Sequence, residues 1–340
     1  MAVLDTFRRP LRNLRISVTD RCNLRCQYCM PEKEYVWLPR QDILDFEEVS
    51  LLVDVFVDLG VNRVRLTGGE PLVRRNLPNL VRLLASKPSL LDIALTTNGV
   101  LLTEQAHGLR EAGLHRVTVS LDTLRPDRFQ SLTRFDELAR VKSGIEAASK
   151  LGFSALKIDA VVIRGVNEDE LVPLVEYGRR VGAEVRFIEY MDVGGATHWS
   201  RDAVVPGSEI LERLGRHYGA IEPVVEESSA PAVRFQLADG LVFGIISSMT
   251  APFCGSCDRS RLTADGMWYL CLYASVGIDL RRPLRAGASE ADLRSRIETG
   301  WDVRADRGAE QRLALQDRSP LLPAGTLRED PHLEMHTRGG

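Results

Sequence analysis

The sequence predicts an α/β fold built on a parallel sheet, arranged either as a partial barrel or as an open doubly wound sheet. Six short β-like runs alternate with amphipathic helical stretches between residues 14 and 191. Glycines stand where several of these helices should end, and five of the six runs have one apolar and one polar face. Repeated βα alternation implies parallel strands joined by right-handed crossovers.

Each β-like run is followed by a stretch of helical periodicity. The runs span residues 14–19, 63–67, 92–97, 115–122, 155–163 and 184–191. The first helical stretch has apolar residues at spacings of three and four, behind a cap at Asp45 with Glu48 three residues later. Predicted helix ends coincide with Gly60, Gly113, Gly152 and Gly182.

The polar faces of these runs predict a lined cavity. From Leu14 to Thr19, apolar and polar residues alternate, and the next four runs show a similar split. Parallel strands buried on both faces are normally apolar on both. Because helices should cover the apolar side, we expect the polar side to surround a polar molecule. The sixth run departs from this rule, since Glu189 and Met191 fall on its apolar face.

The alternation of predicted strands and helices ends after Met191. Residues 192–200 are rich in glycine and loop-like, and residues 206–246 mix a helix with β-like pieces at 233–237 and 241–245. The tail at 304–340 contains several prolines and many charges, and we expect it to be irregular. These patterns predict an N-terminal arm (1–13), a barrel unit (14–225) and a C-terminal region (226–340).

Composition excludes several classes of protein. The chain has 340 residues, 44 Lys and Arg against 47 Asp and Glu, and 44% hydrophobic residues, so it can bury a core and is not disordered. Its formal net charge of -3 lacks the basic footprint of a nucleic-acid binder. No signal peptide or membrane-length apolar run is present. We therefore expect a cytoplasmic protein with neither nucleic acid nor membrane as a partner.

Six cysteines fall into two widely separated groups of three. Cys22, Cys26 and Cys29 form a C-x3-C-x2-C loop after the first run, and Cys254, Cys257 and Cys271 form a C-x2-C-x13-C group. Odd groups in a chain without an export signal do not favour disulfides. Structural zinc usually needs a fourth ligand, which here would be a distant His or Asp. A [4Fe-4S] cluster with three thiolates and one open iron fits better.

The first cysteine loop, with Tyr28 before its last cysteine, resembles the signature of the radical S-adenosylmethionine superfamily. The segment Thr67-Gly68-Gly69-Glu70-Pro71 resembles the GGEP segment of the same superfamily. The sequence FCGSCDRSRLT at residues 253–263 resembles the MoaA family of GTP 3',8-cyclases, which act in molybdenum cofactor biosynthesis. This resemblance runs from residue 14 to about residue 304 and includes the terminal Gly339-Gly340.

The resemblance implies a partial (βα)6 TIM-like barrel, two [4Fe-4S] clusters and roles for particular residues. Ligands of the first cluster would be Cys22, Cys26 and Cys29, and those of the second Cys254, Cys257 and Cys271. Contacts to S-adenosylmethionine are implied for Tyr28, Gly69, Ser120 and Met191. Contacts to GTP are implied for Arg15, Arg65, Thr96, Lys157, Arg259, Ser260 and Arg261. The terminal glycine pair would reach into the active site.

The resemblance also implies the reaction. GTP would become (8S)-3',8-cyclo-7,8-dihydro-GTP, the first step of molybdopterin biosynthesis, after a 5'-deoxyadenosyl radical abstracts the ribose C3' hydrogen. The implied partners are an external electron donor of the flavodoxin or ferredoxin type and a downstream cyclic pyranopterin monophosphate synthase. A homodimer is left open.

Physical reasoning supports a nucleotide site independently, because a triphosphate needs fixed cations. Lys157, between Leu156 and Ile158 in a β run, is hard to explain as a surface residue. Three alternatives stay open: a radical enzyme of the same superfamily acting on another substrate such as a peptide, a non-catalytic iron-sulfur electron carrier, and a zinc-stabilised binding protein.

Overall fold

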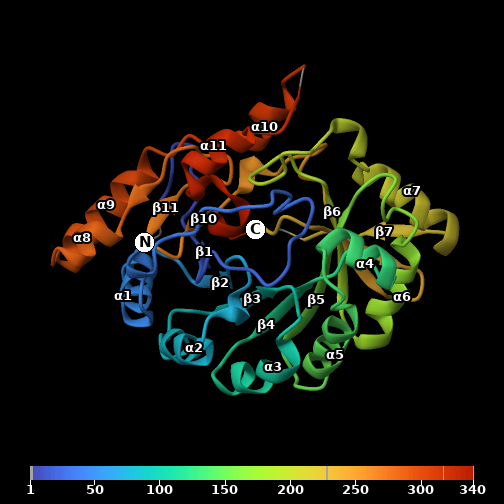
Figure 1. Cartoon of the computed structure of the whole chain (residues 1–340), viewed down its shortest axis with the longest axis horizontal. Helices are drawn as coiled ribbons and strands as arrows, with labels where there is room; N and C mark the ends of the chain where they lie inside the picture. The colour runs from blue at the N-terminus through green and yellow to red at the C-terminus, as the bar shows by residue number, and fades with distance from the viewer. Residues whose placement is uncertain (1–2, 227–228, 317, 340) are drawn as a thin grey trace.

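A single mixed sheet organises the chain and curves into an open barrel (Figure 1). The computed structural model describes residues 3–226, 229–316 and 318–339. Within these residues the strand order is β12-β11-β10-β1-β2-β3-β4-β5-β6-β9-β8-β7. Strands β10, β1 to β6 and β9 run parallel, and the outer strands on both sides are antiparallel. The predicted partial barrel is therefore confirmed.

The strands agree closely with the predicted runs. Their bounds are β1 Asn13–Ser17, β2 Arg63–Thr67, β3 Asp92–Thr97, β4 Arg116–Ser120, β5 Ala155–Val162, β6 Glu184–Glu189, β7 Ile221–Pro223, β8 Val233–Leu237, β9 Val242–Ile246, β10 Arg259–Leu262, β11 Met267–Tyr269 and β12 Ile278–Asp279. The sequence patterns did not predict β10, although it lies beside β1 in the barrel wall.

Most of the longer helices lie outside the barrel wall (Figure 1). Their bounds are α1 Phe46–Asp58, α2 Leu77–Ala85, α3 Leu102–Glu111, α4 Pro126–Thr133, α5 Leu138–Ser149, α6 Leu171–Val181, α7 Gly207–Tyr218, α8 Arg281–Arg285, α9 Glu290–Asp302, α10 Gly308–Leu313, α11 Ala324–Glu329 and α12 Met335–Arg338. None of the helices in the described ranges combines the length and the apolar content that crossing a bilayer requires.

Local sequence signals explain the helix ends. Asp45 accepts a hydrogen bond from the backbone N–H of Glu48, whose side chain accepts one from the backbone N–H of Asp45, so the predicted capping box is present. Gly182 follows α6 with φ +67°, a left-handed conformation that glycine adopts without steric cost.

One large apolar core fills the space between the sheet and its helices. Leu14 and Ile16 of β1, Val64 and Leu66 of β2, and Phe56 of α1 are almost fully buried in it. These strands therefore turn their apolar faces outward toward the helices. Their polar faces are left to line the inside of the barrel, as the alternation predicted.

Glu189 explains why the sixth run broke the parity rule. It ends β6, and its buried carboxylate accepts hydrogen bonds from the backbone N–H groups of Gly207, Met249 and Thr250 and from the hydroxyl of Thr250. The carboxylate thus fixes the start of α7 and the loop after β9 to the end of β6. The predicted strand to Met191 was too long, because Met191 lies in the loop after β6.

The C-terminal part of the chain completes the barrel on both sides. Strands β9 and β10 extend the parallel wall next to β6 and β1. The boundary at residue 225 between the barrel unit and the C-terminal region stays a prediction. Strands from both sides of this boundary belong to one sheet. The tail predicted to be irregular instead contains the short helices α10, α11 and α12, whose periodicity is too brief to show in sequence. In Figure 1 α10 lies at the rim of the molecule, and the end of the chain lies over the centre of the strands.

Trp301 of α9 provides a direct test of this C-terminal packing. Its fully buried ring stacks on Trp268, and its indole N–H donates to the carbonyl of Arg9 at 3.0 Å. We expect Trp301→Ala to lower the free energy of unfolding by about 3–5 kcal/mol. Guanidinium denaturation should show this, with the exposed Ser295→Ala as control. A loss no larger than the control's would contradict the packing role.

Candidate active site

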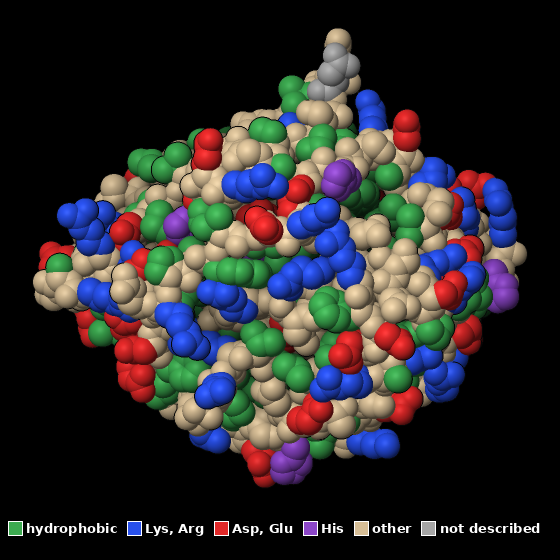
Figure 2. Space-filling model, in the orientation of Figure 1, with side chains coloured by type: hydrophobic (Ala, Val, Ile, Leu, Met, Phe, Trp, Pro, Cys, Tyr) green, Lys and Arg blue, Asp and Glu red, His purple; other side chains and the backbone are tan. Residues whose placement is uncertain are grey.

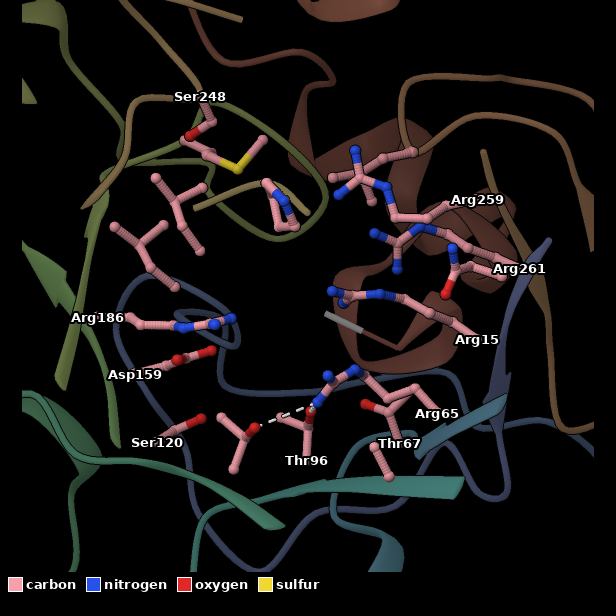
Figure 3. A pocket seen from close by; sticks show the side chains of 18 of the residues that line it. Arg15, Arg65, Thr67, Thr96, Ser120, Asp159, Arg186, Ser248, Arg259 and Arg261 are labelled. Carbon is pink, nitrogen blue, oxygen red and sulfur yellow. Dashed lines mark hydrogen bonds between the residues drawn. The ribbon is translucent and has the colours of Figure 1, made fainter. Parts of the chain in front are cut away.

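The inside of the barrel is a cavity of about 930 Å³ that brings both cysteine groups together. All six cysteines line it, although more than two hundred residues separate the groups. Side chains of β1 to β6 and β10 form its wall. Figure 3 shows Arg15, Arg259 and Arg261 pointing into it from one side and Arg186 and Asp159 from the other.

Strand register places the cavity arginines side by side. Arg15 of β1 is paired with Arg65 of β2 on one side and with Arg261 of β10 on the other. Neighbouring strands lie about 4.8 Å apart, so three guanidinium groups point inward from adjacent backbones. Arg65 donates hydrogen bonds to the hydroxyls of Thr96 at 2.9 Å and Thr118 at 3.2 Å (Figure 3).

The cavity arginines differ in whether a carboxylate pairs with them directly. Arg186 and Arg234 at the cavity wall pair with Glu184. In contrast, Arg15, Arg65, Arg259 and Arg261 have no carboxylate within salt-bridge distance among the described residues. Asp159 of β5 faces these cations and offsets part of their charge, and the surplus of positive charge that is left indicates a site built for a polyanion. On the face seen in Figure 2, Lys and Arg side chains gather near the middle.

The pKa values of these groups reflect the same crowding. Burial, and then the charge of Arg259, lower the pKa of Arg261 to about 10. Burial lowers the pKa of Arg65 to about 10 as well. Burial, followed by Arg186, lowers the pKa of Lys157 to about 8. A bound polyanion would relieve the repulsion between these groups and raise their pKa values again.

The first cysteine group lies on the loop that follows β1. The backbone N–H groups of Cys29 and Met30 both donate to the carbonyl of Cys26, which folds the loop into a tight turn. Burial, followed by the charge of Glu70, raises the pKa of Cys22 to about 11. Burial also raises the pKa of Cys26, as do Cys22 and Cys29, whose proximity makes a set of thiolates unfavourable without a metal.

Gly68 and Gly69 allow the loop after β2 to pass close to the cysteine loop. A Cβ on Gly69 would lie 2.3 Å from the carbonyl oxygen of Arg21, and one on Gly68 would lie 2.3 Å from that of Thr19. The backbone N–H of Glu70 donates to the carbonyl of Arg21 at 2.7 Å. Only glycine permits this approach, which leaves the backbone itself exposed to the cavity.

Two carboxylates near the first cysteine group accept hydrogen bonds from backbone N–H groups and from hydroxyls. Glu70 accepts from the hydroxyl of Thr97 and from the backbone N–H groups of Leu72 and Asn98. Asp122 accepts from the hydroxyl of Tyr28 at 2.7 Å and from the backbone N–H of Val161. Asp122 therefore fixes the ring of Tyr28 at the cavity wall.

The second cysteine group is surrounded by cations. Cys254 begins a single 3-10 turn, Cys254–Ser256, and Cys257 precedes β10. Burial would raise the pKa of Cys257, but Arg259 and Arg304 together lower it to about 7. Nη2 of Arg259 and Nη2 of Arg304 each lie 3.5 Å from Sγ of Cys257. Cys257 thus favours a thiolate, whereas burial raises the pKa of Cys271 in the same group.

The donor sets fit clusters with three thiolate ligands. Each group offers three sulfur atoms to one cavity, and no fourth cysteine exists in the chain. In the described residues, no three His, Cys, Asp or Glu side chains are placed to share one metal ion. A [4Fe-4S] cluster takes its ligands on separate irons, so its thiolates lie farther apart.

The C-terminal tail closes the cavity between the two cysteine groups. Arg261 donates to the carbonyl oxygen of Gly339, whose Cα faces Thr67 so closely that a Cβ would lie 2.3 Å from its methyl carbon. Arg338 donates to the carbonyl of Leu272, next to Cys271. Gly339 therefore lies against Arg261 and Thr67 of the cavity wall, whereas Gly340 lies outside the described residues, and the reach of the pair into an active site stays a prediction.

The structure brings together nearly all the residues that the sequence singled out. The cavity is lined by Cys22, Cys26, Tyr28, Cys29, Arg15, Arg65, Gly69, Thr96, Ser120, Lys157, Met191, Cys254, Cys257, Arg259, Arg261 and Cys271. Ser260 is the exception: its buried side chain lies on the opposite face of β10, since it alternates with Arg259 and Arg261.

Sequence reasoning missed several lining residues. Arg116 and Arg186 line the cavity from the polar faces of β4 and β6, so their parity could have revealed them. His336 had no such signal, because it lies in the four-residue helix α12. Its ring is buried between Tyr35 and Trp37, and neither ring nitrogen has a hydrogen-bond partner among the described residues.

Comparisons with known proteins agree with this geometry. The sequence profile of the Radical SAM superfamily matches residues 16–178, and that of Molybdenum Cofactor Synthesis C matches residues 183–310. The fold resembles the crystal structure of Streptococcus suis SuiB bound to S-adenosylmethionine, with a TM-score of 0.57 at 16% identity, covering 84% of this chain and 68% of that one. The chain is a radical SAM protein.

Full-length relatives define the family more closely. The chain is 56% identical to GTP 3',8-cyclase 1 of Mycobacterium tuberculosis, over 99% of this chain and 95% of the relative. It is 45% identical to the GTP 3',8-cyclase of Acidothermus cellulolyticus, over 93% of this chain and 90% of the relative. It belongs to the GTP 3',8-cyclase family.

A methyl group at Gly69 tests the close approach of the two loops. We expect Gly69→Ala to lower the free energy of unfolding by about 1–3 kcal/mol, because the added carbon meets backbone that must move. Gly215→Ala in α7 is the matched control, since nothing lies within 4 Å of its Cβ. The control should stabilise the protein by up to about 1 kcal/mol. Equal effects in urea denaturation would contradict the approach.

His332 should make the packing of the tail depend on pH. Burial opposes protonation, but hydrogen bonds to Asp265 and Asp330 outweigh it and raise the pKa of His332. This stabilisation is complete below the unfolded pKa of about 6.5 and is lost as pH rises through the raised value. Denaturation across this range should show a decline that His332→Ala lacks and the exposed His107→Ala retains. Parallel curves for native protein and His332→Ala would contradict it.

Proposed function

We propose that this chain is a GTP 3',8-cyclase that converts GTP to (8S)-3',8-cyclo-7,8-dihydro-GTP, the first step of molybdopterin biosynthesis. One observation carries the proposal: four arginines that form no ion pair with a carboxylate of the described residues line the same cavity as two groups of three thiols. A nucleoside triphosphate supplies the missing negative charge, and its size requires a cavity of several hundred cubic ångströms. Membership of the cyclase family supports the same substrate.

Cys22, Cys26 and Cys29 would hold the first [4Fe-4S] cluster and leave one iron open for S-adenosylmethionine. When bound, the cluster and S-adenosylmethionine supply the one-electron chemistry that removes the ribose C3' hydrogen. The chain's part is placement. The exposed backbone at Gly69, the ring of Tyr28 held by Asp122, and the side chains of Ser120 and Met191 line the adjoining wall.

Arg15, Arg65 and Lys157 would bind the triphosphate, helped by Thr96, whose hydroxyl already accepts from Arg65. Arg259 and Arg261 would hold the nucleotide next to the second cluster, bound by Cys254, Cys257 and Cys271. Fixing C3' and C8 of one molecule at reacting distance turns ring closure into an oriented intramolecular step. The tail at Gly339 would help to exclude water from the reacting atoms.

The chemistry requires further partners. Reductive cleavage of a sulfonium consumes one electron, so we propose an external one-electron donor of the flavodoxin or ferredoxin type. The cyclised nucleotide must be rearranged further, which we assign to a cyclic pyranopterin monophosphate synthase. The proposal also includes a homodimer, which a measurement of the protein's molecular mass in solution would test.

Replacing Cys271 separates the two halves of the reaction. We expect Cys271→Ala to release 5'-deoxyadenosine from S-adenosylmethionine while forming no cyclised nucleotide, because only the second cysteine group is damaged. Anaerobic incubation with GTP, S-adenosylmethionine and dithionite, followed by mass spectrometry, measures both products. Cys22→Ala is the matched control and should release neither. Normal cyclisation by Cys271→Ala would contradict the second site, and turnover of another substrate by the native chain would contradict the function.

A further inference from the structure

Arg304 is an arginine buried against the second cysteine group, outside the residues assigned to GTP. Only 1% of its side chain is exposed. Its Nη1 donates to the carbonyl of Cys257 at 2.9 Å, its Nη2 lies 3.5 Å from Sγ of the same residue, and its Nε donates to the carbonyl of Leu270 at 3.1 Å. The guanidinium therefore holds the backbone before Cys271 as well as Cys257 itself.

The N-terminal arm supports this guanidinium. Asp5, whose side chain is fully buried, lies 2.9 Å from Nη1 of Arg304 and 2.6 Å from Nε of Arg9. Arg9 in turn donates to the carbonyl of Cys254 at 2.8 Å. Residues 5 and 9 thus reach two of the three cysteines of a group that follows them by about two hundred and fifty positions.

The charges of Arg9, Arg304 and Asp5 do not balance. Two buried guanidiniums share the single carboxylate of Asp5, which leaves a net positive charge in a place without water. An uncompensated buried cation is costly unless an anion lies next to it. The sulfur of Cys257 accepts from both Arg304 and Arg259, so an anionic sulfur at this position would supply the negative charge that lies closest to the Arg304 guanidinium.

We propose that Arg304, oriented by Asp5, is a positioning residue of the second cluster: it fixes Cys257 for ligation and stabilises the reduced state of the cluster by a hydrogen bond and a buried positive charge. The N-terminal arm is then a structural part of the second metal site. This proposal goes beyond GTP binding, and it rests on the proposed function only in requiring that Cys254, Cys257 and Cys271 hold a cluster.

The sign of the effect follows from charge. A reduced cluster carries one more negative charge than an oxidised one, so a neighbouring cation and an N–H donor to sulfur favour reduction. Removing both should shift the reduction potential to more negative values. Keeping the charge but losing the planar fork, as lysine does, should give a smaller shift.

The test uses the full chain with Cys22, Cys26 and Cys29 replaced by Ala, so that only the second cluster is seen. In this background, Arg304→Met, Arg304→Lys and Asp5→Asn are compared by iron per chain and by a redox titration followed by electron paramagnetic resonance. Arg296→Met on the exposed face of α9 is the matched control. We expect Arg304→Lys to lower the reduction potential of the second cluster slightly and Arg304→Met to lower it more. Asp5→Asn should also shift this potential, and the control should leave it unchanged.

The outcomes separate this proposal from the proposed function. Loss of the second cluster's iron from folded Arg304→Met supports the positioning role, and if that variant does not fold, Arg304→Lys and Asp5→Asn decide. Full iron with the potential and spectrum of the control would overturn the role of Arg304. Absence of a cluster in the background chain itself would instead overturn the assignment of the second cysteine group, and with it the proposed function.

Discussion

Like charges held close together inside the barrel are the constraint on which the rest of the structure depends. Arg261, Arg15 and Arg65 are neighbours in register, so their backbone positions hold three guanidinium groups in one part of the cavity. Without a bound anion, the repulsion between these three arginines destabilises the folded protein. The apolar faces of the same strands, buried beneath helices such as α1, provide the stabilisation that tolerates it. The protein is thus organised so that a polyanionic ligand completes it electrostatically.

The two cysteine groups meet this row under different electrostatic conditions. Burial and mutual repulsion disfavour thiolates in the first group, whereas Arg259 and Arg304 favour one in the second. Losing the thiol protons on metal binding therefore costs more at Cys26 than at Cys257. The backbone contacts of Glu70 and the hydrogen bond from Tyr28 to Asp122 order the first loop by other means.

The sequence predicted the parts of the molecule that repeat. The runs at 63–67 and 92–97 coincide with β2 and β3, because strict alternation against a helix-covered core defines a strand locally. Glu189 could not be understood in that way, since its partners are the first residue of α7, Gly207, and a residue of the loop after β9, Thr250. Nor could β10, whose four residues are a strand only because β1 lies beside them. Alternation along a strand can predict which of its side chains face the cavity, as the position of Arg186 on β6 shows. The positions of His336 and Arg304 depend on tertiary packing, which no local pattern reveals.

The closure of the barrel by segments from both ends of the chain has a consequence for biosynthesis. Strand β1 and the arm before it emerge first, yet their partners β10 and Arg304 are translated only after most of the protein. On the ribosome, the first cysteine loop must wait beside an unpaired strand edge until residues 259–262, which form β10, have been translated. Nascent or truncated chains are therefore expected to be clients of chaperones, and iron-sulfur insertion belongs after release.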